Sequence, residues 1–149
     1  MATAFAEHKA AYAHVTTGVE LTEGRHYWEV ELLLEGANRF VGVTRPNLDP
    51  LGGYVTGTDG WFIKAASGSL WGNGKLNDDE AGEYEQGDRV GVLLDLNKGS
   101  LLFFKNGVQH GPGYPAGSVT GPVVAALELC FANQAVKLHA AVAFPAGHA

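Results

Sequence analysis

Hydrophobic and polar positions alternate with a period of two along residues 25–34, RHYWEVELLL. This period is typical of a β-strand with one buried face, and Trp, Tyr and Val favour strands. Residues 89–96, RVGVLLDL, repeat the alternation. The expected buried face carries His26, Trp28, Val30, Leu32 and Leu34 in the first strand and Val90, Val92, Leu94 and Leu96 in the second. Tyr27, Glu29, Glu31 and Leu33 then form the opposite face, which the glutamates predict to be solvated.

Shorter apolar runs, separated by turn residues, predict further strands. They cover residues 39–44 (RFVGVT), 61–65, 69–71, 100–105 (SLLFFK) and 108–110, and a last pair, 122–131 and 134–143, is expected around an Ala132-Asn133 turn. Asn106-Gly107 is the clearest hairpin signal, because both residues tolerate the positive φ of a type I′ turn. The stretch 72–88 is polar and has no period, so we expect mainly loop there.

The whole pattern predicts an all-β fold. Only residues 3–13, TAFAEHKAAYA, could form one or two helical turns. About ten short strands without crossover helices are typical of an antiparallel sandwich or barrel, and we favour a two-sheet sandwich. The 149 residues fit one domain spanning 1–149, and the 21 scattered glycines agree with many turns.

Charge and cysteine content narrow the function. The formal net charge is −6 and the ten basic residues are dispersed, so no basic stripe for nucleic acid is expected. Cys130 is the sole cysteine, which excludes an internal disulfide and favours a reducing compartment, the cytoplasm or nucleus. No apolar run approaches the roughly 20 residues that span a membrane.

Candidate catalytic and metal-binding residues are few. The six histidines lack the close spacing of a zinc site, and Cys130 lies in an apolar run, VVAALELCF, where a free cysteine is usually a small hydrophobe. The acidic residues between 77 and 88 lack the spacing of a calcium loop. We therefore expect no catalytic residue, no metal and no cofactor.

Four motifs in order resemble the SPRY (B30.2-type) domain. They are GRHYWEVEL at 24–32, VGVTR at 41–45, GDRVGVLLDL at 87–96 and FKNG at 104–107, and the similarity extends over about residues 10–138. Asp95 lies among apolar neighbours at the end of a strand, where we expect it to accept backbone hydrogen bonds from the following turn. Gly42 and Gly91 interrupt strands where a large neighbour, such as Trp28, needs room.

The resemblance implies a bent two-sheet sandwich without catalytic activity that recognises a protein or short peptide through loops at one side. Carried over by position, it implies that these loops bind the partner through Arg45, Asn47, Tyr54, Asp59, Trp61, Phe131, Ala132 and Asn133. Tyr and Trp make good binding anchors, but Trp61 begins an apolar strand and fits the core equally well. We expect a monomer.

Two other functions remain open. A lectin-like module would use an aromatic platform with Asn and Asp side chains, and Tyr54, Asn47, Asp49 and Asp59 could supply them. A sandwich-fold hydrolase would need a carboxylate pair on a concave sheet face, for which the chain offers only Glu29 and Glu31. The solvated sheet face predicted above explains this pair better.

Overall fold

The computed structural model describes residues 13–33, 39–73, 75–76, 80–129 and 136–148, and these contain eleven strands and no helix. The strands are β1 (Ala13–Thr16), β2 (Arg25–Leu32), β3 (Arg39–Thr44), β4 (Gly60–Lys64), β5 (Leu70–Gly72), β6 (Lys75–Leu76), β7 (Arg89–Asp95), β8 (Ser100–Lys105), β9 (Val108–Gln109), β10 (Val124–Leu129) and β11 (Val136–His139). The all-β prediction is confirmed.

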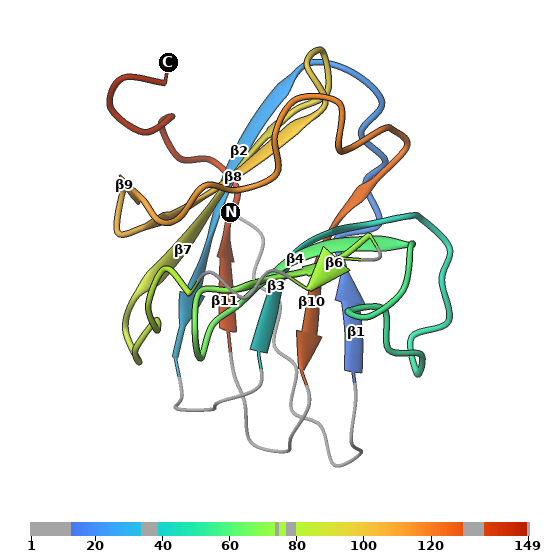
Figure 1. Ribbon diagram of the computed structural model, residues 1–149, viewed down its shortest axis with the longest axis horizontal. Coiled ribbons are helices and arrows are strands. Elements are labelled where there is room, and N and C mark those ends of the chain that lie inside the picture. Colours follow the sequence, from blue (N-terminus) through green and yellow to red (C-terminus); the bar gives the residue numbers. More distant parts are fainter. Residues whose placement is uncertain (1–12, 34–38, 74, 77–79, 130–135, 149) are drawn as a thin grey trace.

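The strands form two antiparallel sheets (Figure 1). The six-stranded sheet has the order β1-β10-β3-β4-β5-β6, and the five-stranded sheet has the order β11-β2-β7-β8-β9. Their facing sides share one hydrophobic core, to which β2, β3, β7 and β8 contribute alternate residues. Trp28, Val41, Val92 and Phe103 are among its buried members. The two-sheet sandwich is therefore the correct alternative.

Strand positions agree closely with the alternation in the sequence. Strands β3 and β8 have the expected bounds, and β2 begins at Arg25 as predicted but ends at Leu32. The Asn106-Gly107 turn has φ values of 50° and 86°, as a type I′ turn requires. Two short strands were not predicted: β1, and β6 within the stretch expected to be loop.

The expectation that residues 122–131 and 134–143 form a pair is wrong. β10 lies between β1 and β3 in the six-stranded sheet, whereas β11 pairs with β2 in the five-stranded sheet. The Ala132-Asn133 turn and the segment 3–12 lie outside the described residues. Periodicity identifies strands but says nothing about their partners, so two consecutive strands were joined that the fold separates.

Candidate binding surface

The β3–β4 loop, residues 45–59, folds back over the outer face of the six-stranded sheet. Tyr54 and Val55 pack there against Phe40, Phe62 and Ala126, in a cluster separate from the central core. The loop therefore buries part of its own side chains and is held against the sheet, so it presents a defined surface.

Tyr54 is the aromatic centre of this loop and is half-buried rather than freely exposed. Its hydroxyl donates a hydrogen bond to the backbone oxygen of Asp49 (2.9 Å), and its ring meets the His14 imidazole edge-on, with centroids 4.8 Å apart. Desolvation, followed by the nearby Asp49 carboxylate, raises the pKa of Tyr54. The phenol therefore remains neutral at physiological pH and presents a fixed ring edge.

A buried polar network holds the loop in place. Glu128, on β10, is 0% exposed, and its Oε1 accepts a hydrogen bond from the Tyr54 N–H at 2.6 Å. Its Oε2 lies 3.3 Å from Nδ1 of His14, whose Nε2 lies 3.3 Å from Oγ1 of Thr44. The backbone N–H of His14 also donates a hydrogen bond to the Pro50 carbonyl (3.0 Å). The sequence did carry a signal for this network: a single carboxylate inside an apolar strand needs a buried partner.

Arg45 joins the loop to the segment 118–122. Its guanidinium donates to the backbone oxygens of Thr120 and Pro122, the second at 3.0 Å, and to Oγ1 of Thr120 at 2.7 Å. It also lies over the Trp61 ring, 5.0 Å from the centroid. Most of the hydrogen-bonding capacity of Arg45 is thus used within the chain. The residue predicted to contact a partner therefore also holds the β3–β4 loop against the segment 118–122.

Trp61 is a core residue. Its side chain is 2% exposed, and its indole N–H donates to the backbone oxygen of Ser118 at 3.0 Å. The expectation that it contacts a partner is corrected, because β4 is buried on both faces and its first large residue points into the sandwich. The Trp61 ring instead packs against the Arg45 guanidinium.

The remaining predicted residues divide in two. Asn47 and Asp59 are exposed on the same loop, and Asn47 has a positive φ of 63°. The Asp59 carbonyl accepts the Arg45 backbone N–H at 2.9 Å, which draws together the two ends of the loop. Phe131, Ala132 and Asn133 lie outside the described residues.

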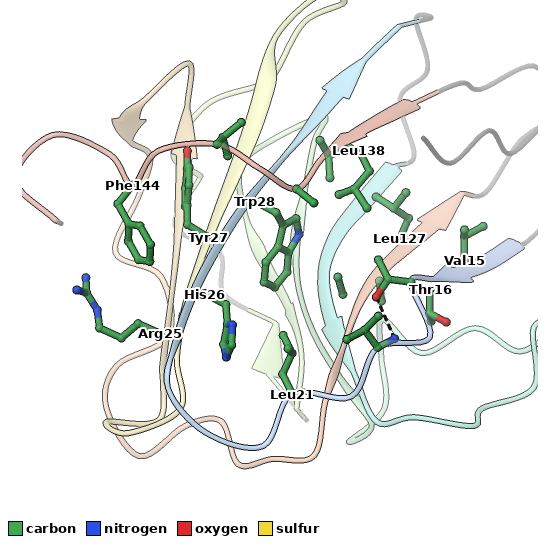
Figure 2. Close-up of a pocket in the computed structure, with 17 residues that line it drawn as sticks. Val15, Thr16, Leu21, Arg25, His26, Tyr27, Trp28, Leu127, Leu138 and Phe144 are labelled. Carbon is green, nitrogen blue, oxygen red and sulfur yellow. Dashed lines mark hydrogen bonds between the residues drawn. The ribbon is translucent and has the colours of Figure 1, made fainter. Parts of the chain in front are cut away.

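A groove of about 670 Å³ opens at the edge of the sandwich where β1 and β10 lie near the start of β2 (Figure 2). One side is formed by β1, β10 and the segment that follows β1, and the other by the first half of β2, by Leu138 and by the C-terminal segment. We call it the β2-edge groove. Sequence reasoning missed it, because it arises where β11 stops short of the start of β2.

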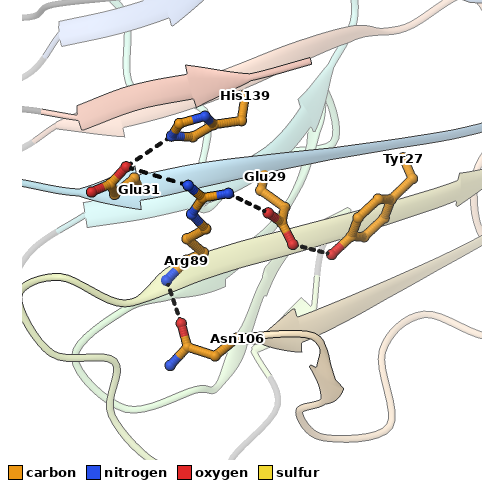
Figure 3. Close-up of polar contacts among 6 residues, drawn as sticks. All are labelled: Tyr27, Glu29, Glu31, Arg89, Asn106 and His139. Atoms are coloured by element: carbon orange, nitrogen blue, oxygen red, sulfur yellow. Dashed lines mark hydrogen bonds and ion pairs between the residues drawn. The ribbon is translucent and has the colours of Figure 1, made fainter. Parts of the chain in front are cut away.

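Glu29 and Glu31 belong to an ion-pair network on the outer face of the five-stranded sheet (Figure 3). Arg89 lies between them, 3.1 Å from Glu29 and 3.9 Å from Glu31. The Tyr27 hydroxyl donates to Glu29 at 2.8 Å, and Nε2 of His139 lies 2.8 Å from Glu31. Burial, and then the Glu29 carboxylate, raise the pKa of Tyr27. The predicted solvated face is in fact a paired, half-buried network, and this arrangement gives a hydrolase no support.

The described residues contain no group of three or more His, Cys, Asp or Glu side chains that could hold a metal ion. Within the same residues, no helix is long and apolar enough to cross a membrane.

The fold is an antiparallel β-sandwich, and in such folds binding residues commonly lie on the connecting loops. A family model, SPRY domain, matches residues 25–142. The chain belongs to the SPRY domain family, whose members are protein-interaction modules.

Individual relatives agree. The human tripartite motif-containing protein 64B is 32% identical over 108 residues, which cover 68% of this chain but 23% of that protein. The SPRY domain of human HERC1 superposes with a TM-score of 0.77 at 21% identity, covering 91% of this chain and 86% of that one. A second human SPRY domain gives 0.73 at 19% identity, covering 92% and 89%.

Proposed function

We propose that this domain binds another protein, through an exposed segment of that protein, at the β3–β4 loop and the adjoining segment 118–122, and that it catalyses no reaction. The observation that carries the proposal is the fixed, half-buried ring of Tyr54. Because Glu128 and His14 already order the loop around it, a partner would lose little conformational entropy on binding there.

The contact surface that we propose combines this ring with exposed polar groups. Asn47 and Asp59 flank Tyr54 on the loop, and the outer side of Arg45 adjoins the Thr120 segment. We also propose that Phe131 supplies a second aromatic contact with the partner, together with its neighbours Ala132 and Asn133. Such a mixture of an aromatic anchor with polar neighbours is typical of protein-binding sites. The single cysteine supports a cytoplasmic or nuclear location for this interaction.

The test is an affinity capture from lysate of the source organism, followed by affinity measurement on the partner that is recovered. Tyr54→Ala and Phe131→Ala are each expected to weaken binding by about 1–3 kcal/mol, the range for an aromatic anchor. Val108→Ala serves as the control, because Val108 is 71% exposed on β9, in the other sheet. Wild-type affinity in both folded variants would refute the proposed surface. Hits on a glycan array, with no protein captured, would favour the lectin-like alternative.

A further inference from the structure

Strand β2 is paired along its whole length on one side and along half of it on the other. Its partner β7 pairs with it from Arg25 to Glu31, whereas β11 pairs only from Glu29 to Leu32. After His139 the chain leaves the sheet and turns over its outer face. Among the described residues, the first half of β2, in the five-stranded sheet, therefore has no neighbouring strand along its edge on the side of β11.

The backbone groups that this edge exposes follow from the ladder. The Leu96 N–H donates to the Gly24 carbonyl (2.8 Å) and the Leu32 N–H donates to the Asp88 carbonyl (3.0 Å), so even-numbered residues of β2 bond to β7. Odd-numbered residues face the side of β11. Within the described part of the chain, the N–H and C=O groups of Arg25 and Tyr27 have no hydrogen-bond partner. Unpaired backbone groups beside apolar surface are a template for another strand.

Apolar side chains flank this edge on both sides. Val15, Leu127 and Leu138 lie on the side of the central core (Figure 2), whereas Val142 and Phe144 pack on the side of Tyr27, on the outer face of the five-stranded sheet. Side chains of an added strand alternate between two faces, so apolar residues at alternate positions would enter the groove. The groove thus offers both of the features that recognition by strand addition uses: main-chain hydrogen bonds and side-chain pockets.

The charged side chain that lines the groove is positive. No Asp or Glu lines it, although the chain carries a net charge of −6, and its one permanently charged side chain is Arg25. That side chain is 37% exposed, and its Nε lies 3.6 Å from the Asp95 carboxylate. Its guanidinium also donates to the His148 carbonyl and lies over the Phe144 ring, so only its remaining N–H groups are left for an anionic partner. The charge of the groove is therefore complementary to an occupant that places a carboxylate at the Arg25 end.

We propose that the β2-edge groove binds an extended segment of a partner protein, which pairs with β2 at Arg25 and Tyr27, inserts alternate apolar side chains and places an acidic residue beside Arg25. The segment continues the lane of β11 and runs antiparallel to β2, so its acidic residue lies at its C-terminal end. A fatty acid would match the apolar lining and Arg25, but it has no groups to pair with the Tyr27 N–H and C=O. This site shares no residue with the proposed loop surface and does not depend on it.

The free edge is tested first, in the unliganded protein, by amide hydrogen exchange of β2. The Tyr27 N–H is expected to exchange about tenfold or more faster than those of Glu29 and Glu31, which face the same side but pair with β11. Equal protection of all three amides would overturn the proposal, because the edge would then be occupied already.

Binding is tested with an acetylated peptide, Lys-Lys-Thr-Val-Thr-Val-Thr-Glu, followed by amide chemical shifts and exchange. It is expected to shift Val142 and Phe144 and to protect the Tyr27 amide, whereas a control with the central Val-Thr replaced by Pro-Pro is not. Equal effects of both peptides, or the absence of any effect, would overturn strand addition. Shifts produced by decanoate but not by the first peptide would instead identify a lipid-binding groove and also overturn it.

The charge at the end of the groove is tested with Arg25→Gln. Wild type is expected to prefer the Glu-ended peptide to a Gln-ended one about twofold to fivefold, as an exposed ion pair allows, and the variant is expected to show no preference. Val142→Asp is expected to abolish binding, and Val108→Asp, at an exposed site on β9, is the matched control. Retained preference in Arg25→Gln would contradict the assigned orientation.

Discussion

Two glycines inside strands show how closely the backbone of this sandwich is packed. A Cβ on Gly42 would lie 1.8 Å from the carbonyl oxygen of Trp61, which belongs to the neighbouring strand and cannot move away. A Cβ on Gly91 would lie 2.3 Å from the Tyr27 hydroxyl. The expectation that a large side chain needs room is confirmed at Gly91, where the side chain is Tyr27 instead of Trp28. It is wrong at Gly42, where the neighbour is the backbone of β4.

Gly42→Ala is expected to destabilise the domain by about 3 kcal/mol, because β3 and β4 must separate locally to admit the methyl group. The free energy of unfolding from urea denaturation provides the measurement. Gly57→Ala is the control, since nothing lies within 4 Å of its Cβ position, and it is expected to change stability by less than about 0.5 kcal/mol. Similar values for the two variants would show that the sheet relaxes around the added group.

Other residues show where sequence reasoning ends. Asp95 was expected to accept backbone hydrogen bonds from the following turn, and its Oδ1 accepts those of Asn97 and Lys98, both at 3.0 Å. A carboxylate before a turn has few other ways to be satisfied, so this prediction was secure. Trp61 could not be assigned in the same way, because apolar residues occupy both faces of β4 and alternation is lost there.

At the scale of elements, the β3–β4 loop derives its shape from two strands that lie far from it in sequence. His14 on β1 and Glu128 on β10 are 114 residues apart, and both bond to the segment 50–54. The sequence predicted that a loop would be present and that Tyr54 would belong to it. It did not predict this anchor, because a buried polar contact between distant strands depends on the order of strands in the sheet. Hydrophobic periodicity does not give that order.

Glu128→Ala is expected to destabilise the domain by about 3 kcal/mol, since it leaves the Tyr54 N–H and His14 without their buried acceptor. Glu128→Gln retains an oxygen that can accept the Tyr54 N–H and is expected to cost clearly less. Urea denaturation measures both values, and the amide exchange rate of Tyr54 reports on the loop directly. An equal loss in both variants would mean that the hydrogen bond from the Tyr54 N–H to Glu128 does not account for the stabilisation.

At the scale of the whole molecule, the C-terminal segment 140–148 covers the part of the outer face of the five-stranded sheet that carries Tyr27 and Phe104 (Figure 1). Phe144 lies 6.1 Å from the Tyr27 ring and is capped by the Arg25 guanidinium at 5.1 Å. The His148 ring contacts Phe104 edge-on at 5.1 Å. Tyr27, predicted to face solvent, is consequently 6% exposed. The alternation correctly assigned it to the outer face, but a local pattern cannot reveal that a distant segment returns to cover that face.

Phe144→Ala is expected to lower the free energy of unfolding by about 1–2 kcal/mol, because the half-buried ring contributes part of a full Phe burial. It is also expected to increase solvent exposure of Tyr27, measurable by its fluorescence quenching or ring chemical shifts. Val108→Ala provides an exposed apolar control. Unchanged stability and an unchanged Tyr27 signal would show that the segment does not protect this face.

The order of strands has a consequence for synthesis of the chain. The edge strand β1 pairs only with β10 among the described strands, and β3 has β10 as one of its two neighbours. A nascent chain that has not yet emerged past residue 129 therefore leaves β1 unpaired and one edge of β3 open. The meander β7-β8-β9 can form early, but completion of either sheet waits for the last strands, and such long-range pairing is slow. This domain is thus committed to folding after nearly all of it has been made, with its apolar faces exposed until then.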